Sequence, residues 1–193
     1  MNTKIKTQTI VGLGLLTAIV VVLQAFALSI RFGVFTITLV LAPIIVGAAL
    51  YKWWAGAWLG FVFGVVVLLT DAGAFLAVNI PGTIITCIAK GVLAGIVAGV
   101  VYKALESKNK MLAVILAGIA APVTNTGVFL LGCLVFFLDT IKGWAEALGY
   151  ESAGKYLIFG MVGVNFIVEL VINLALSTAI VQIINYAKKN SNV

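Results

Sequence analysis

The chain has 193 residues, of which 63% are hydrophobic and only 9% are charged, and its mean hydropathy is +1.24. A soluble domain usually carries about 25% charged residues, so this composition excludes an ordinary soluble fold. The formal net charge of +6 comes from basic residues that stand singly between apolar runs, which excludes a basic stripe that binds nucleic acid.

The long apolar runs predict an all-α fold, an integral membrane bundle of six transmembrane helices. A crossing helix needs roughly 20 apolar residues, and these runs lack the strict alternation of a transmembrane barrel. In chain order, the predicted helices cover residues 10–30, 35–50, 55–70, 83–102, 111–138 and 156–186. Residues 1–193 are therefore expected to form a single membrane domain without a separate soluble domain.

The first run follows a short basic leader, as a signal peptide does. The apolar core of a signal peptide has about 7 to 15 residues, whereas this run is about twenty residues long and another span follows it directly. We therefore expect it to be retained as a helix.

Two connections are longer than a turn. Residues 71–82 mix charge and helix breakers, and we expect a loop that folds back onto the bundle. Residues 139–155 are long and polar enough to form the one sizeable loop, with room for a short surface helix.

The basic residues predict the orientation in the membrane. Six crossings place both termini on one side, and the charges then divide unevenly between the two sides. The terminal side holds Lys4, Lys6, Lys52, Lys103, Lys108, Lys110, Lys188 and Lys189, and the other side holds Arg31, Lys142 and Lys155. The positive-inside rule then predicts cytoplasmic termini, with the loops near Arg31, Asn79 and Trp144 facing outward.

Glycines recur every four residues in the third and fourth predicted helices. Gly56, Gly60 and Gly64 form one series, and Gly91, Gly95 and Gly99 form the other. Small residues at this spacing let helix backbones approach closely, so we expect these two faces to pack helices. Gly14 and Ala18 in the first helix form a shorter version that serves internal packing or docking of a partner.

Lys90 and Glu169 are charged residues within predicted spans, where a charge costs at least about 2.5 to 3.5 kcal/mol. Asn125 reaches a similar depth, and Asn165 shares a helical face with Glu169 because the two are four residues apart. One interpretation is a buried ion pair between Lys90 and Glu169, capped by asparagines. The other is an outward-facing pocket in which Lys90 meets an anionic group and the amides bind a polar solute.

Residues 121–127, Ala-Pro-Val-Thr-Asn-Thr-Gly, interrupt the fifth predicted helix. Pro122 leaves the carbonyl of Gly118 without its intrahelical donor, and the polar residues that follow can satisfy freed backbone groups or a ligand. Broken helices near the midplane are common at transporter sites, but a simple kink remains the alternative.

Taken in order, these features resemble the substrate-binding S-component of an energy-coupling factor (ECF) vitamin transporter. The resemblance covers nearly the whole chain: six spans, cytoplasmic termini, the segment at residues 121–127, and the glycine series GAWLGFVFG and KGVLAGIVAG. The signature of that family in helix one is alanine, three residues, alanine. Here Gly14 and Ala18 stand in these positions as a relaxed form.

The resemblance implies uptake of a vitamin across a bacterial plasma membrane. It also implies partners: a transmembrane coupling subunit and two ATPases, since the chain has no phosphate-binding GxxxxGK[ST] segment of its own. Gly14 and Ala18 are the expected docking residues. The expected substrate site combines outward loops with the outer halves of helices four to six, and its residues are Arg31, Asn79, Lys90, Asn125, Thr126, Phe129, Asn165 and Glu169.

A lysine among amides suits a ligand with a carboxylate and several hydroxyl or amide groups, so pantothenate is the first candidate. A stand-alone secondary transporter, with Glu169 and Asp71 relaying protons, is the alternative. An enzyme is not expected, because the chain has no histidine for a serine triad or a zinc site. We expect no cofactor and no metal, and we expect Cys87 and Cys133 to be reduced packing residues.

Overall fold

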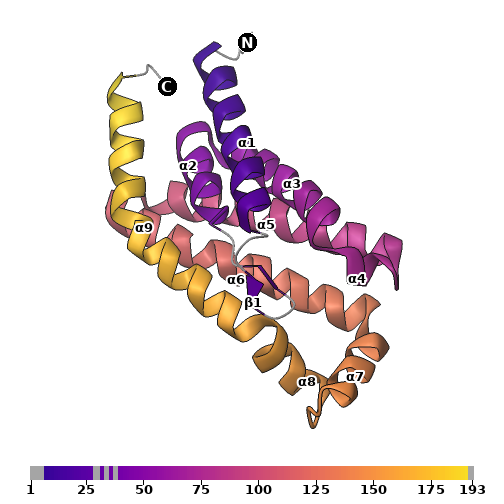
Figure 1. The fold of residues 1–193 in the computed structure, drawn as a ribbon. Coiled ribbons are helices and arrows are strands. Elements are labelled where there is room, and N and C mark those ends of the chain that lie inside the picture. The colour runs from indigo at the N-terminus through magenta and orange to yellow at the C-terminus, as the bar shows by residue number, and fades with distance from the viewer. Residues whose placement is uncertain (1–6, 28–30, 33–34, 37–38, 191–193) are drawn as a thin grey trace.

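The computed structural model describes residues 7–27, 31–32, 35–36 and 39–190, and these ranges are almost entirely helical (Figure 1). The first helix, α1, spans Thr7–Ala27. A hairpin of two-residue strands follows, β1 (Arg31–Phe32) and β2 (Phe35–Thr36). The next helices are α2 (Leu41–Tyr51), α3 (Trp53–Thr70) and α4 (Gly73–Leu76).

From residue 80 onward, the chain contains most of the long helices that meet at the cavity described below. The elements of this part are α5 (Ile80–Leu105), α6 (Lys110–Phe136), α7 (Leu138–Ala147), α8 (Ala153–Lys155), the π-helix η1 (Tyr156–Val162) and α9 (Gly163–Asn190). The short helix predicted between the last two spans is confirmed as α7. The segment predicted to fold back onto the bundle contains α4, which packs against α3 and α5.

Within the described ranges, five stretches are long and apolar enough to cross a membrane: Thr7–Phe26, Trp53–Thr70, Ile80–Leu105, Lys110–Phe136 and Ala153–Lys189. The helix predicted over residues 35–50 is wrong at its start, because β2 occupies residues 35–36 and α2 has only 11 residues. A helix of that length rises about 16 Å, roughly half of the hydrocarbon core. Residues 32–36, Phe-Gly-Val-Phe-Thr, combine aromatic and β-branched residues with a glycine, a composition that favours a hairpin.

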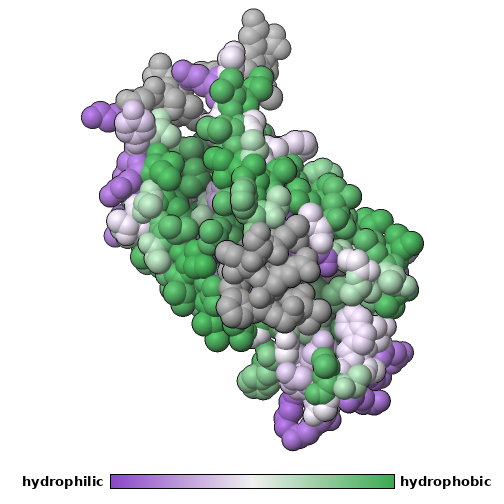
Figure 2. All heavy atoms as spheres, viewed as in Figure 1, coloured by the Kyte–Doolittle hydropathy of each residue, from purple (hydrophilic) through white to green (hydrophobic). Residues whose placement is uncertain are grey.

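The outer surface is apolar over most of the face shown in Figure 2, and hydrophilic residues gather at the two ends. This distribution is expected of a membrane protein, since lipid cannot hydrogen-bond to exposed polar groups. In contrast, α2 is buried along most of its length, from Leu41 to Ala49. The bundle therefore encloses α2 and presents its longer helices to lipid.

The prediction that the glycine series pack helices is confirmed at the contact between α3 and α5. A Cβ atom built at Gly60 would overlap the carbonyl oxygen of Gly91, and one built at Gly91 would overlap the carbonyl oxygen of Gly60. Gly56 and Gly95 oppose each other in the same way. The two backbones touch directly, and this contact fixes the position of the α5 residues that face the cavity.

The two ends of the bundle are held by specific contacts. At the end where α1 begins and α9 ends (Figure 1), Glu106 forms salt bridges with Lys103 at 2.6 Å and with Lys188 at 2.8 Å. Burial by itself would raise the pKa of the Glu106 carboxyl, but the hydrogen bonds from Lys103 and Lys188 hold this pKa below its usual value. At the opposite end, Gln24 of α1 donates a hydrogen bond of 2.9 Å to Asp71, which follows α3.

Candidate functional site

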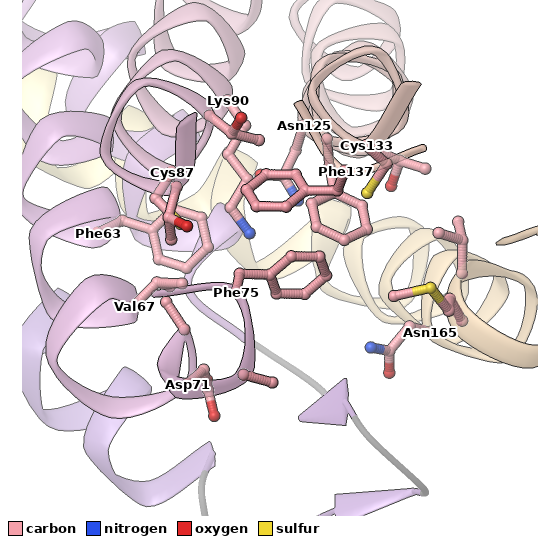
Figure 3. A pocket seen from close by; sticks show the side chains of 18 of the residues that line it. Phe63, Val67, Asp71, Phe75, Cys87, Lys90, Asn125, Cys133, Phe137 and Asn165 are labelled. Carbon is pink, nitrogen blue, oxygen red and sulfur yellow. The ribbon is translucent and has the colours of Figure 1, made fainter. Parts of the chain in front are cut away.

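A cavity lies among α1, α3, α5, α6, α7, η1 and α9, at the end of the bundle that holds α4 and α7 (Figure 3). The centres of water molecules can occupy about 130 Å³ of it. One water needs only about 10–15 Å³ on this measure, so the cavity has room for a small organic ligand. Its wall is mostly apolar, with a few polar groups, which is the usual composition of a small-molecule site.

Among the described residues that line the cavity, Lys90 carries the positive charge. Its ammonium lies 5.5 Å from the ring centroid of Phe63 on α3 and 5.4 Å from that of Phe129 on α6. Such cation–π contacts contribute roughly 0.5–2 kcal/mol each. The salt bridges among the described residues do not include a pair between Lys90 and Glu169. The positive charge is therefore held by aromatic faces, and its hydrogen-bond donors remain available to an anionic ligand.

Several polar side chains of the wall are almost completely buried. Asn125 is 7% exposed and Glu169 is 6% exposed. The side-chain oxygen of Asn125 has no hydrogen-bond partner within the described structure. Buried polar atoms are nearly always paired in native proteins, so an orphaned oxygen on a cavity wall indicates a missing polar partner.

Aromatic rings close the cavity toward α4 and α7. Phe75 of α4 meets three other rings at steep angles, with centroid distances of 5.0 Å to Phe137, 5.8 Å to Phe129 and 5.5 Å to Trp144. Edge-to-face pairs of this kind contribute about 0.5–1.5 kcal/mol each beyond the buried area. The segment that carries α4 is thus attached to α6 and α7 through Phe75, whose ring lies between Lys90 on one side and Asp71 on the other (Figure 3).

The cavity brings together six of the eight residues expected in the substrate site. These are Lys90, Asn125, Thr126, Phe129, Asn165 and Glu169. Asn79 is not part of the wall: it caps the start of α5, where its side chain accepts a hydrogen bond of 2.9 Å from the backbone nitrogen of Gly82. A residue of this type next to proline and glycine is a strong helix-capping signal, and the cap explains its presence. Arg31 lies in β1, but its side chain is outside the described part of the structure.

Sequence reasoning did not single out Gln24, Thr86, Phe63 or Phe75, which also line the cavity. Gln24 is completely buried and Thr86 is 5% exposed. A single glutamine in an otherwise apolar span was the one available signal for Gln24, since polar residues within spans are rare and functional. Thr86 and the phenylalanines carry no such signal, because these residue types are common in membrane helices.

The expected docking pair lies on the outer face of α1. Gly14 and Ala18 are both exposed, and no atom lies within 4 Å of a Cβ built at Gly14. Cys87 and Cys133 are free and buried, as predicted. Among the residues that the structure describes, no group of three cysteine, aspartate or glutamate side chains is arranged to hold a metal ion.

A helical membrane protein that encloses a cavity with a lysine, buried amides and aromatic walls belongs to the class of solute-binding membrane proteins. Comparison with known proteins narrows this class. Residues 8–181 match the family model of the ECF transporter substrate-specific component. The chain is also similar to the pantothenic acid transporter PanT of Lactococcus lactis subsp. cremoris, with 30% identity over 206 residues that cover 97% of this chain and 99% of the relative. No solved structure matches the chain.

The chain therefore belongs to the family of substrate-specific components of ECF transporters. It is a multi-pass membrane protein that provides the substrate specificity of a transporter.

Proposed function

We propose that this chain binds pantothenate in the cavity around Lys90 and delivers it to an ATP-driven ECF transporter. The observation that carries the proposal is the ammonium of Lys90, which lies between two phenylalanine rings without an ion-pair partner among the described residues. Pantothenate has one carboxylate to meet this charge, and its amide and two hydroxyls match the polar groups of the wall. The similarity to a pantothenic acid transporter supports the same ligand.

Titration calorimetry of the purified chain with a panel of vitamins tests the ligand. We expect saturable one-to-one binding of pantothenate. Riboflavin and folate, which are larger and favour stacking between aromatic rings, should give no comparable heat. Thiamine carries a positive charge and should be repelled by Lys90. Tight binding of another vitamin, with no heat from pantothenate, would show that the substrate assignment is wrong.

The proposed topology has six crossings and cytoplasmic termini. The positions of the helix ends support it. Tyr51, at the end of α2, packs against Gly12 near the start of α1, whereas the residue after α3, Asp71, bonds Gln24 near the end of α1. Between the end of α1 and the end of α2, the chain thus returns to the end of the bundle where it began. That end is rich in lysine, which favours the cytoplasmic side.

The proposed partners are a transmembrane coupling subunit and two ATPases, because the sequence has no phosphate-binding motif that could supply the energy. We expect these three subunits to copurify with the tagged chain from its native membrane. Replacing Gly14 with leucine should reduce the copurified amount several-fold, because it adds bulk on the exposed face of α1. A cross-link from the exposed Lys108 to an ATPase would also place that end of the bundle in the cytoplasm.

The matched control is Gly143→Leu. Gly143 is also exposed, and a Cβ built there has no atom within 4 Å, but this glycine lies in α7 at the other end of the bundle. The control variant should therefore copurify with the same three subunits in undiminished amount. If the chain purifies without ATPases and accumulates pantothenate in proteoliposomes on a proton gradient, it is a secondary transporter instead.

A further inference from the structure

Besides the oxygen of Asn125, two further buried oxygen atoms of the cavity wall have no hydrogen-bond partner within the described structure: Oε1 of Gln24 and Oγ1 of Thr86. We propose that the ligand binds with its carboxylate innermost at Lys90. The oxygen of Thr86 then accepts a hydrogen bond from the amide N–H of the ligand, and the oxygen of Gln24 accepts one from its terminal hydroxyl. The inference rests on the proposed function, and it assigns an orientation to the ligand in the same site.

The hydrogen bonds around Gln24 determine what its oxygen can bind. The side-chain nitrogen of Gln24 donates to Oδ2 of Asp71 at 2.9 Å, so the amide is oriented with its oxygen away from that carboxylate. The residue is completely buried, and no donor among the described residues reaches the oxygen. A donor group on a ligand in the cavity can complete it.

Thr86 differs from other threonines of the bundle. Thr17, Thr70 and Thr83 each donate their hydroxyl to the carbonyl four residues earlier, at 2.7 or 2.8 Å, which is the usual arrangement in a helix. The hydroxyl of Thr86 makes no such bond, although the residue is only 5% exposed. An unused polar atom at this depth is costly unless a ligand completes it.

The three groups follow one another along the bundle axis. Thr86 precedes Lys90 by one turn of α5, which places it about 6 Å closer to the α4 end. Phe63 of α3 lies at the level of Lys90, because its ring contacts the ammonium. Asp71 follows Phe63 by eight residues, so the Gln24–Asp71 pair lies about 12 Å from that level, toward the α4 end. The order from the interior is Lys90, then Thr86, then Gln24.

The dimensions of pantothenate fit this order. Its carboxyl carbon and its terminal hydroxyl oxygen are eight bonds apart, about 10 Å in an extended chain. With the carboxylate at Lys90, the amide N–H comes near Thr86, and the terminal hydroxyl reaches Gln24. The Gln24–Asp71 pair would then recognise the end of the ligand that lies toward α4.

Paired changes in protein and ligand test the inference by calorimetry. Gln24→Leu should weaken pantothenate binding about tenfold, the usual cost of one buried hydrogen bond. An analogue in which hydrogen replaces the terminal hydroxyl should bind the unaltered chain about tenfold more weakly than pantothenate. Gln24→Leu should change the affinity for this analogue less than about twofold, because the bond is already absent.

Thr86→Val should likewise lower the affinity for pantothenate about tenfold. It should change the affinity for the ester analogue little, because that analogue lacks the amide N–H. Thr86→Ser keeps the hydroxyl and should retain most of the affinity, which separates a lost bond from a damaged fold. The matched control is Thr70→Val, whose threonine lies in α3 outside the cavity wall and is expected to leave affinity unchanged.

Two results would overturn the orientation alone. In one, the losses from Gln24→Leu and from the missing hydroxyl multiply to about a hundredfold, which shows that the two groups do not meet. In the other, the losses of affinity from Lys90→Met and from removing the terminal hydroxyl are not additive, whereas those from Lys90→Met and from replacing the carboxylate are. Pantothenol, the alcohol analogue, provides the change at the carboxylate. No binding of pantothenate to the unaltered chain would instead overturn the proposed function, and the orientation with it.

Discussion

Replacing Lys90 with methionine is expected to lower the affinity for pantothenate about a hundredfold or more. Loss of one partner from a buried, hydrogen-bonded charge pair costs about 2–5 kcal/mol, and about 1.4 kcal/mol corresponds to a factor of ten. Methionine keeps an unbranched side chain between the rings of Phe63 and Phe129, so the packing is preserved while the charge is removed. Calorimetric titration of the purified variant measures the loss.

The same variant separates ligand binding from a structural role of Lys90. Without an ion-pair partner among the described residues, the cost of removing the Lys90 charge from water should offset its cation–π contacts in the empty protein, and Lys90→Met should melt at the same temperature or higher. Lys108→Met, which removes an exposed lysine far from the cavity, should bind pantothenate normally. Unchanged affinity in Lys90→Met together with a lower melting temperature would support the buried ion pair as the explanation of this lysine.

Replacing Gly60 with leucine is expected to prevent the native packing of α3 against α5. The new Cβ would overlap the carbonyl oxygen of Gly91, which is backbone and cannot rotate away. Overpacking of a helix contact costs typically about 1–3 kcal/mol and more when no side chain can move. We expect a large fall in the melting temperature in detergent, loss of a monodisperse peak in size-exclusion chromatography, and loss of pantothenate binding.

Gly14→Leu is the matched control, since it makes the same chemical change in another long apolar helix. No atom lies within 4 Å of a Cβ built at Gly14, so this variant should melt close to the unaltered chain. A Gly60→Leu protein with normal melting behaviour would show that α3 and α5 can separate without loss of the fold.

The sequence predicted much of the fold, because lipid imposes simple requirements. Long apolar runs mark helices, and glycines at four-residue spacing mark helix contacts. The same logic identified Lys90, Asn125 and Glu169, because a polar group within a span is costly and needs a reason to be there. These signals are local, so they do not require knowledge of how the chain folds.

Other features depend on which segments meet in space. Asn79 reads as a polar residue of an outward loop, but the proline and glycine after it make it a helix cap. An ion pair of Lys90 with Glu169 was one of two interpretations, suggested by their opposite charges, whereas in the fold the ammonium lies over the rings of Phe63 and Phe129. Phenylalanine is too common in membrane helices for its spacing to show this.

By itself, the sequence determined the class of the protein, the course of its long helices and the presence of a lysine within a span. Only the tertiary structure decided that Gln24, Thr86 and Phe75 line one cavity with that lysine, and that α2 is short and enclosed. The physical reason is that the free-energy cost of placing a polar side chain in the membrane depends on that residue and its neighbours in the sequence. Hydrogen-bond complementarity instead depends on groups that only folding brings together.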